Sequence, residues 1–164
     1  MVTTTATRTA WEIAASVLDP EVPVLTIEDL GILRTVDDRG PQDGGVTVTI
    51  TPTYSGCPAM DSIRDDVLAA FHDAGRDDVR VEFVLAPAWT TDWMSEAGKR
   101  KLLEYGIVPP QPRDSRRVPL RLTLRCPQCG SPDTRELSRF GSTACKSLWV
   151  CNACREPFDH FKAI

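Results

Sequence analysis

The sequence predicts an α+β fold in which a small domain of helices and strands precedes a short, all-β, metal-binding domain. Three observations support this prediction. The first two-thirds of the chain carries apolar residues at both helical and strand spacing, the last third carries two C-x-x-C pairs, and the segment VPPQPRDSRRVP lies between them. Because that segment is rich in proline and charge, it is typical of a linker. We therefore expect domains at 1–110 and 119–164, joined by a linker at 111–118.

The composition suits a folded protein of the cytoplasm. A hydrophobic fraction of 41% is enough for a packed core, and the chain has no run of about 18 apolar residues that could span a membrane. The N-terminal stretch MVTTTATRTAWEI lacks the apolar segment of a secretory signal. In a reducing compartment, six cysteines are more typical of metal ligands or reactive thiols than of disulfides.

Charge divides unevenly along the chain. Residues 1–118 hold 12 basic and 19 acidic side chains, a balance of −7, whereas residues 119–164 hold 7 and 4, a balance of +3. A local basic run spans the boundary between these two parts: Arg113, Arg116, Arg117, Arg121 and Arg125. A nucleic-acid-binding protein is therefore one hypothesis. The whole chain is acidic, with a pI near 5.2, and would repel phosphates, so we expect no nucleic-acid partner.

The first domain is expected to begin with a helix and a hairpin. Thr9 and Glu12 have the spacing of a capping box, and Trp11, Ala15 and Leu18 recur at helical spacing until the Asp-Pro pair at 19–20. Residues 31–36 and 46–51 read as strands with a hairpin loop between them, and residues 46–51 alternate apolar with β-branched polar residues, as a half-buried strand does.

Another helix, a third strand and a last helix complete the domain. A helix from Pro58 to Gly75 is indicated by an apolar stripe of Met60, Ile63, Val67, Phe71 and Ala74. Residues 79–85 read as a strand, and 95–105 as a helix capped by Ser95. The order αββαβα predicts helices packed on a short sheet.

A lone cysteine, Cys57, stands where the second helix should begin. If Pro58 is the first helical residue, Cys57 is the helix cap, where unpaired N–H groups and the helix dipole would lower its pKa. A free cysteine is also commonly just a small buried hydrophobe. The position alone leaves both interpretations open.

The second domain is predicted to be a zinc ribbon. Cys126 and Cys129 form one C-x-x-C pair, and Cys151 and Cys154 form another after 21 intervening residues. Four thiolates close a tetrahedral structural site around one Zn²⁺, and a domain this small relies on its metal to fold. Rubredoxin-type iron is the chemical rival, but only CPQCG resembles that motif. Strands are expected at 120–125, 134–140, 147–150 and 158–164.

Three motifs of the first domain together resemble a known family. They are DPEVPV from Asp19, DLG from Asp29 and TYSGCP from Thr53. They are similar to those of the SufT-like family, which is associated with iron–sulfur cluster assembly and whose reactive residue is the cysteine of the T-x-x-x-C-P motif. The longer strings TPTYSGCPAMD and APAWTTDWMSEAGKRKLLEYGI resemble the PaaD family of phenylacetate degradation, and this resemblance extends over nearly the whole chain.

The resemblance implies roles for four side chains. It makes Cys57 the functional thiol, and Asp19 and Glu21 match acidic positions of the family. The ordinary alternatives are a helix-ending residue before proline for Asp19 and a solvated charge for Glu21. Carboxylates near a thiol raise its pKa, so convergence of the three would favour a bound metal. Cys145 lies in FGSTACK, a stretch that PaaD-like proteins carry, which suggests that it faces the Cys57 site or a partner; an ordinary cysteine is the alternative.

The function that the resemblance implies is that of an accessory protein, not an enzyme. It would assist assembly or insertion of iron or an iron–sulfur cluster in the multicomponent phenylacetyl-CoA 1,2-epoxidase. Its partners would be epoxidase subunits or the iron–sulfur assembly machinery. Its cofactors would be one structural Zn²⁺ and, transiently, iron or a cluster. No catalytic triad, phosphate loop or paired histidines are visible. A stable, non-catalytic subunit that tunes electron transfer is the alternative.

Overall fold

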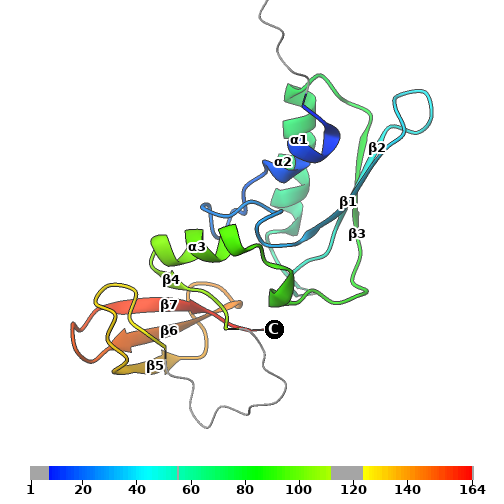
Figure 1. Cartoon of the computed structure of the whole chain (residues 1–164). Helices are drawn as coiled ribbons and strands as arrows, with labels where there is room; N and C mark the ends of the chain where they lie inside the picture. The colour runs from blue at the N-terminus through cyan, green and yellow to red at the C-terminus, as the bar shows by residue number, and fades with distance from the viewer. Residues whose placement is uncertain (1–7, 55, 112–123, 164) are drawn as a thin grey trace, which may run out of the picture. The chain divides into compact units, whose positions relative to one another are not determined.

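The computed structural model describes residues 8–54, 56–111 and 124–163. The chain forms two compact units, one up to Trp89 and one from Thr90 onward (Figure 1). The predicted linker apart from its first residue, and most of the predicted strand 120–125, lie outside the described residues, as does the basic run except for Arg125. None of the described helices has both the length and the apolar character needed to cross a membrane.

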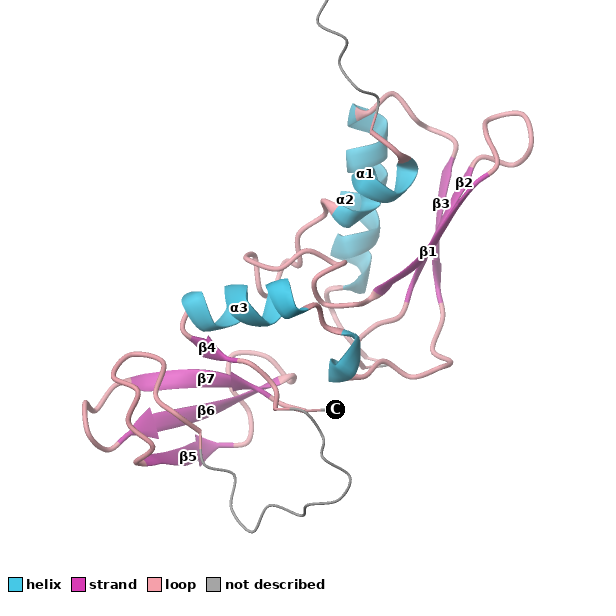
Figure 2. Ribbon diagram, viewed as in Figure 1, coloured by secondary structure: helices cyan, strands magenta, loops and turns pink. Residues whose placement is uncertain are grey.

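The first unit is a three-stranded sheet covered on one face by two helices (Figure 2). Strand β1 (Leu33–Asp38) pairs antiparallel with β2 (Val46–Ile50), and β2 pairs in parallel with β3 (Val79–Phe83). The parallel pair needs a crossover connection, which α2 (Met60–Asp73) supplies. These elements confirm the predicted α+β class.

The core of this unit lies between the sheet and the helices. Alternate residues of β2 are fully buried, as the period of a strand requires: Val46, Val48 and Ile50. They share the core with the buried residues of α2, which are Ile63, Val67 and Phe71. The predicted stripe of α2 is thus confirmed at its centre, while Met60 at one end is half-buried and Ala74 after the other is exposed.

Helix α1 (Ala10–Ala15) has the predicted capping box but a different buried face. The side chain of Thr9 accepts a hydrogen bond from the Glu12 N–H at 3.2 Å, and the Glu12 carboxylate accepts from the Thr9 N–H at 2.7 Å. The predicted stripe was wrong, since Trp11 is 39% and Leu18 50% exposed. Leu18 is exposed because α1 ends at Ala15, so helical spacing no longer applies there, while within the helix the buried residues are Ala10, Ile13 and Ala14.

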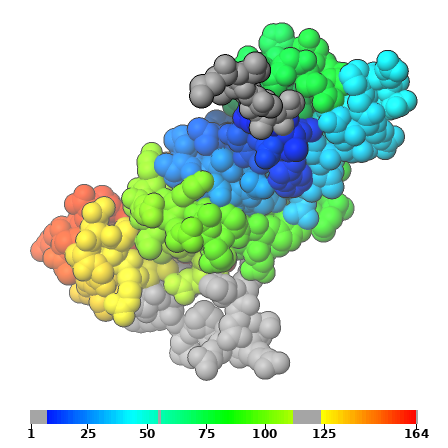
Figure 3. All heavy atoms as spheres, turned by 45° about the horizontal axis from the view of Figure 1, so that its top comes forward, coloured from blue at the N-terminus to red at the C-terminus, as the bar shows by residue number. Residues whose placement is uncertain are grey.

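The hairpin of β1 and β2 is fixed to the rest of the unit at its far end, where loop 39–45 projects in cyan (Figure 3). A Cβ atom on Gly45 would lie 2.0 Å from the carbonyl oxygen of Asp78, so no other residue allows this close approach. The guanidinium of Arg76 bonds Asp38 at the end of β1 at 3.0 Å and Asp78 before β3 at 2.9 Å. These contacts join the antiparallel hairpin to the parallel crossover.

The second unit contains α3 (Glu96–Glu104) and a four-stranded sheet, preceded by the short 3₁₀ helix η1 (Thr91–Trp93). The strands are β4 (Ile107–Val108), β5 (Thr134–Ser138), β6 (Lys146–Cys151) and β7 (Pro157–Phe161), in the order β4-β7-β6-β5. Three of them correspond to predicted strands. Ser95 caps α3 as predicted, accepting from the Gly98 N–H at 2.8 Å.

The division of the chain differs from the predicted boundary at residue 110. Helix α3 leads directly into β4, and β4 pairs in parallel with β7, through Ile107 with Asp159 and Val108 with His160. This pairing places residues that we assigned to the first domain in the unit of the ribbon. A two-residue strand leaves no periodic pattern by which it could be recognised in advance.

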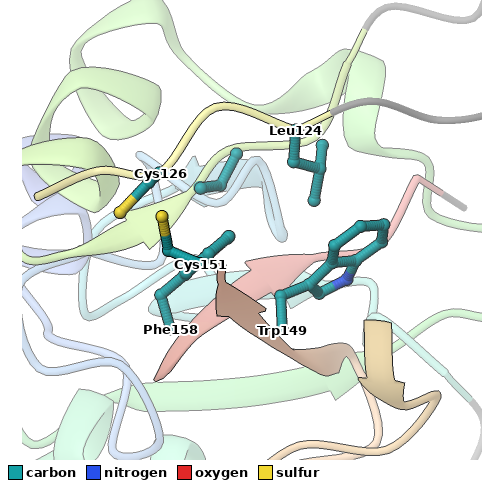
Figure 4. Packing of buried hydrophobic residues seen from close by; sticks show 6 residues of the cluster. Leu124, Cys126, Trp149, Cys151 and Phe158 are labelled. Carbon is teal, nitrogen blue, oxygen red and sulfur yellow. The ribbon is translucent and has the colours of Figure 1, made fainter. Parts of the chain in front are cut away.

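The core of the ribbon combines apolar side chains with two of the motif cysteines. Its buried cluster consists of Val108, Leu124, Cys126, Trp149, Cys151 and Phe158. Figure 4 shows the sulfur atoms of Cys126 and Cys151 turned toward one another beside these side chains. The hydrophobic core and the cysteine site are therefore contiguous.

A buried polar group lies next to this core, on β6 and β7. The hydroxyl of Ser147 accepts a hydrogen bond from Trp149 Nε1 at 3.0 Å and lies 3.3 Å from His160 Nδ1. The other ring nitrogen of His160 is buried without a partner among the described residues. Burial lowers the pKa of His160 to about 4, so the ring is neutral near pH 7.

The two histidines should therefore titrate on opposite sides of the ordinary histidine pKa of 6.5. The pKa of exposed His72 is raised, mainly by its hydrogen bond to Asp77. An NMR titration of the ring protons should show His72 protonating first as the pH falls. Since unfolding releases His160 to its ordinary pKa, stability should fall by about 3 kcal/mol as the pH drops from 6.5 to about 4. A His160 curve centred at or above 6.5 would contradict its burial.

Candidate functional site

The four motif cysteines form one compact group of sulfur atoms. All four Sγ atoms lie within 4.8 Å of one another: those of Cys126, Cys129, Cys151 and Cys154. Two of the separations are 3.7 Å, between Cys126 and Cys154, and 3.6 Å, between Cys129 and Cys151. A tetrahedral ion with metal–sulfur bonds of about 2.3 Å has sulfur–sulfur edges of about 3.8 Å. The residues therefore fit a single four-coordinate metal ion.

The two C-x-x-C turns repeat the same backbone geometry. In each, the residue after the second cysteine has a positive φ, 72° for Gly130 and 69° for Arg155. The N–H of this residue donates to the carbonyl of the first cysteine, at 2.9 Å in one turn and 3.0 Å in the other. The N–H of the first cysteine in each pair donates to the carbonyl of the residue after the one with positive φ. These bonds join Cys126 to Ser131 and Cys151 to Glu156, both at 3.0 Å. The chain thus presents two equivalent halves of one site.

The electrostatics of the group favour a cation at its centre. The pKa of Cys151 is lowered to about 7, first by the N–H of Cys154, which lies 3.5 Å from its sulfur. The N–H of Glu156 lowers the pKa of Cys154, but burial and the neighbouring thiols outweigh it and raise that pKa to about 12. Without a cation, ionisation of one thiol therefore suppresses ionisation of another.

Cys57 lies in the loop between β2 and α2 and does not cap the helix. Helix α2 begins at Met60, and its N-cap is Ala59, which makes no side-chain capping bond. The prediction that Cys57 caps this helix was therefore wrong. The reason is that the residues before Met60 form a turn of their own, in which the Cys57 N–H donates to the carbonyl of Tyr54 at 3.3 Å.

The pKa of Cys57 is raised, not lowered as we expected from the position. Burial of the half-buried thiol is the main cause. The N–H of Ala59 favours the thiolate, but the carboxylates of Glu21 and Asp19 oppose it, and a hydrogen bond from the Tyr54 side chain compensates only in part. Near pH 7 the side chain is accordingly a protonated thiol in an acidic environment.

The segment that follows α1 brings both acidic residues close enough to act on Cys57. Asp19 is only 7% exposed, and its Oδ1 accepts from the N–H groups of Glu21 at 2.9 Å and Val22 at 2.7 Å. Asp19 therefore has a structural role in its own turn. Glu21 is half-buried on the same turn. That these three residues share a ligand remains a prediction.

Cys145 belongs to the second unit, whereas Cys57 belongs to the first. It is 4% exposed, its sulfur lies 2.9 Å from the hydroxyl of Thr143, and its carbonyl accepts from the Lys162 N–H at 2.9 Å. The next residue, Lys146, is itself buried. A role for Cys145 beyond packing remains a prediction.

Sequence reasoning overlooked two side chains. Tyr54 acts on the Cys57 thiol, and its place inside the T-x-x-x-C-P motif could have pointed to it. Arg155 occupies the position that glycine holds in the other C-x-x-C turn, a difference visible when CPQCG and CNACR are aligned.

Two protein families match different parts of this chain. Residues 8–83 match a family described as "Iron-sulfur cluster assembly protein", and residues 110–162 match the "PaaD zinc beta ribbon domain". A crystal structure of a domain of unknown function (DUF59) from Bacillus anthracis is similar to the fold, with a TM-score of 0.50 and 26% identity. The similar region covers 57% of this chain and 87% of that one.

Two curated relatives extend the comparison. A protein of Porphyromonas gingivalis named "Fe-S protein maturation auxiliary factor" is 39% identical, over 57% of this chain and 84% of its own length. A protein of Escherichia coli, named as one subunit of a "Putative 1,2-phenylacetyl-CoA epoxidase", is 47% identical over 94% of this chain and 91% of its own. With both the ribbon and this full-length similarity, the chain belongs to the PaaD family.

Proposed function

We propose that this protein is an accessory maturation factor for the phenylacetyl-CoA epoxidase, which assists assembly or insertion of iron or an iron–sulfur cluster. The single observation that carries the proposal is the environment of Cys57. A thiol held beside two carboxylates, in a domain of the iron–sulfur assembly family, suits a cationic cargo.

The acidic surroundings of Cys57 favour binding that is reversible. Each carboxylate makes the empty thiolate less favourable, so the proton stays on the sulfur until a cation arrives. An iron ion or cluster then replaces that proton, because its positive charge is stabilised by the same carboxylates that destabilised the thiolate. Since the displaced proton competes with the cargo, the site can release what it has bound.

The second unit has a structural role in this proposal. Cys126, Cys129, Cys151 and Cys154 would hold one Zn²⁺, whose chemistry here is to fix four thiolates in a closed tetrahedral site. A closed site leaves no open position for cargo, so we assign cargo binding to Cys57 alone. The ribbon then presents its outer surface to a protein partner.

A second candidate function is that of a stable, non-catalytic component of the oxygenase. The name of the Escherichia coli relative, which describes it as an epoxidase subunit, favours this alternative. A stable component stays bound to the assembled enzyme, whereas a maturation factor leaves it. Affinity purification of the mature epoxidase distinguishes the two, by the presence or loss of this chain at stoichiometric amounts.

The decisive experiment measures the iron and sulfide content of each epoxidase component, produced with and without this protein. The proposal expects at least one component to be deficient in iron or sulfide when this protein is missing. Equal contents in both preparations would reject maturation, while loss of activity with full metal content would favour the alternative of a stable component.

The ribbon should hold one Zn²⁺ per chain. Cys151→Ser removes both a ligand and a member of the buried cluster, so it should abolish stoichiometric zinc and unfold the second unit. Elemental analysis and the NMR spectrum are the measurements, with Ser138→Ala on β5 as a control that leaves the ligands intact. Iron with a rubredoxin-like spectrum in wild-type protein would contradict the choice of metal.

Cys57→Ser should leave the fold intact and abolish maturation. Serine has nearly the size of cysteine but is a poor ligand for iron, and Cys57 makes no capping bond that the fold requires. Cells carrying the variant should lose growth on phenylacetate and accumulate iron-deficient epoxidase. Leu68→Ala, on the exposed side of α2, is the matched control. Normal growth of the serine variant would make Cys57 a packing residue.

Glu21→Gln should lower the pKa of Cys57, because it removes one of the charges that oppose the thiolate. Alkylation near pH 7.5 should become about twofold to tenfold faster, since the thiolate fraction changes about tenfold per pKa unit. Alkylation rates measured over a pH series with Cys57 as the monitored site provide the test. Glu28→Gln, whose carboxylate bonds Trp11 instead, should leave the rate unchanged.

A further inference from the structure

One of the two C-x-x-C turns carries arginine where the backbone favours glycine. Gly130 and Arg155 occupy equivalent positions, with φ of 72° and 69° and the same hydrogen bond to the first cysteine of the pair. In the part of the chain that the structure describes, Arg155 is the only non-glycine residue with a positive φ. A non-glycine side chain in this left-handed conformation, against its backbone preference, points to a use for that side chain.

Arg155 lines a surface pocket together with a second arginine. The pocket has a volume of about 520 Å³ and is lined by Arg135, Val150, Cys151, Asn152 and Arg155. Arg135 lies on β5, where it pairs with Val150 of β6. Arg155 lies in the turn that follows β6. Neither guanidinium forms an ion pair with another described residue of the chain.

We propose that this pocket binds the phosphate group of a small phosphorylated molecule. Two guanidinium groups present planar forks of donors that match phosphate oxygens, and their two positive charges balance a phosphate dianion. The volume lies in the range of about 300–1,000 Å³ typical of small-molecule sites and exceeds that of phosphate alone. Val150 offers an apolar wall for the remainder of the ligand.

Two other roles are conceivable for the arginines, namely neutralising the metal centre and binding an acidic segment of a protein partner, and each predicts a different experimental result. Four thiolates around a divalent ion carry a net charge of −2, which Arg135 and Arg155 would offset if their role were only to neutralise the metal centre. An acidic segment of a protein partner could also supply an anion, but each carboxylate carries one charge, and a hollow suits a small ligand better than a flat protein surface does.

The test uses the full-length, metal-loaded protein and glycerol 3-phosphate as the probe, with glycerol as the uncharged control. Binding is followed by NMR shifts of the amides of residues 150–155. The wild-type protein should bind the phosphate at millimolar or lower concentration and should not respond to glycerol. Arg155→Gly and Arg135→Gln should each weaken binding by tenfold or more, whereas Arg139→Gln, an exposed arginine outside the pocket, should not.

Arg155→Gly also separates binding from stability. Glycine suits the positive φ, so the variant should keep its metal and melt at the same temperature as the wild type or above it. The proposal is overturned if wild-type protein fails to bind the probe, or if Arg139→Gln weakens binding equally. It is also overturned if Arg155→Gly loses metal while binding is unchanged, or if only a glutamate-rich peptide binds.

Discussion

Repulsion between four thiolates is the constraint on which the second unit depends. The sulfur atoms lie so close together that they cannot all ionise unless a cation joins them. Two of the four cysteines are also members of the buried cluster, beside Trp149 and Phe158. The apolar core and the metal site are consequently one structure, and neither is expected to persist without the other.

The first unit uses a cysteine in the opposite electrostatic setting. In the second C-x-x-C turn an N–H group is directed toward the sulfur of Cys151, which favours its thiolate. Around Cys57, burial is the main influence that opposes ionisation, and the carboxylates of Glu21 and Asp19 add to its effect. The pKa of one cysteine in each unit thus departs from the ordinary value in opposite directions, lowered for Cys151 by N–H groups and raised for Cys57 by burial and by neighbouring carboxylates.

Features of the fold that depend on neighbouring residues could be predicted from the sequence. The capping box of Thr9 and Glu12, the Ser95 cap and the spacing of the four ribbon cysteines are local patterns, and the structure confirms each. Where local preferences competed, prediction failed. Pro58 is suited to the first position of a helix, yet a turn around Cys57 delays the start of α2 to Met60.

Long-range effects could not be predicted in the same way. The pKa of Cys57 is raised mainly by burial and then by Glu21, from a segment far away in the sequence. Motif resemblance alone suggested that Cys57 and Glu21 converge. The assignment of α3 and β4 to the second unit depends on the pairing of β4 with β7. Because β4 is so short, this pairing could not be predicted from the sequence. The positive φ of Arg155 is likewise a property of the folded turn.

The pairing of β4 with β7 also has a consequence for the order of events during synthesis. Ile107 and Val108 leave the ribosome well before residues 157–161, the strand beside which they lie in the sheet. The first unit can complete its own sheet earlier, because its strands end at Phe83. During translation, the segment of α3 and β4 must therefore remain without its partner strand until β7 has been made, and the sheet of the second unit can be completed only then.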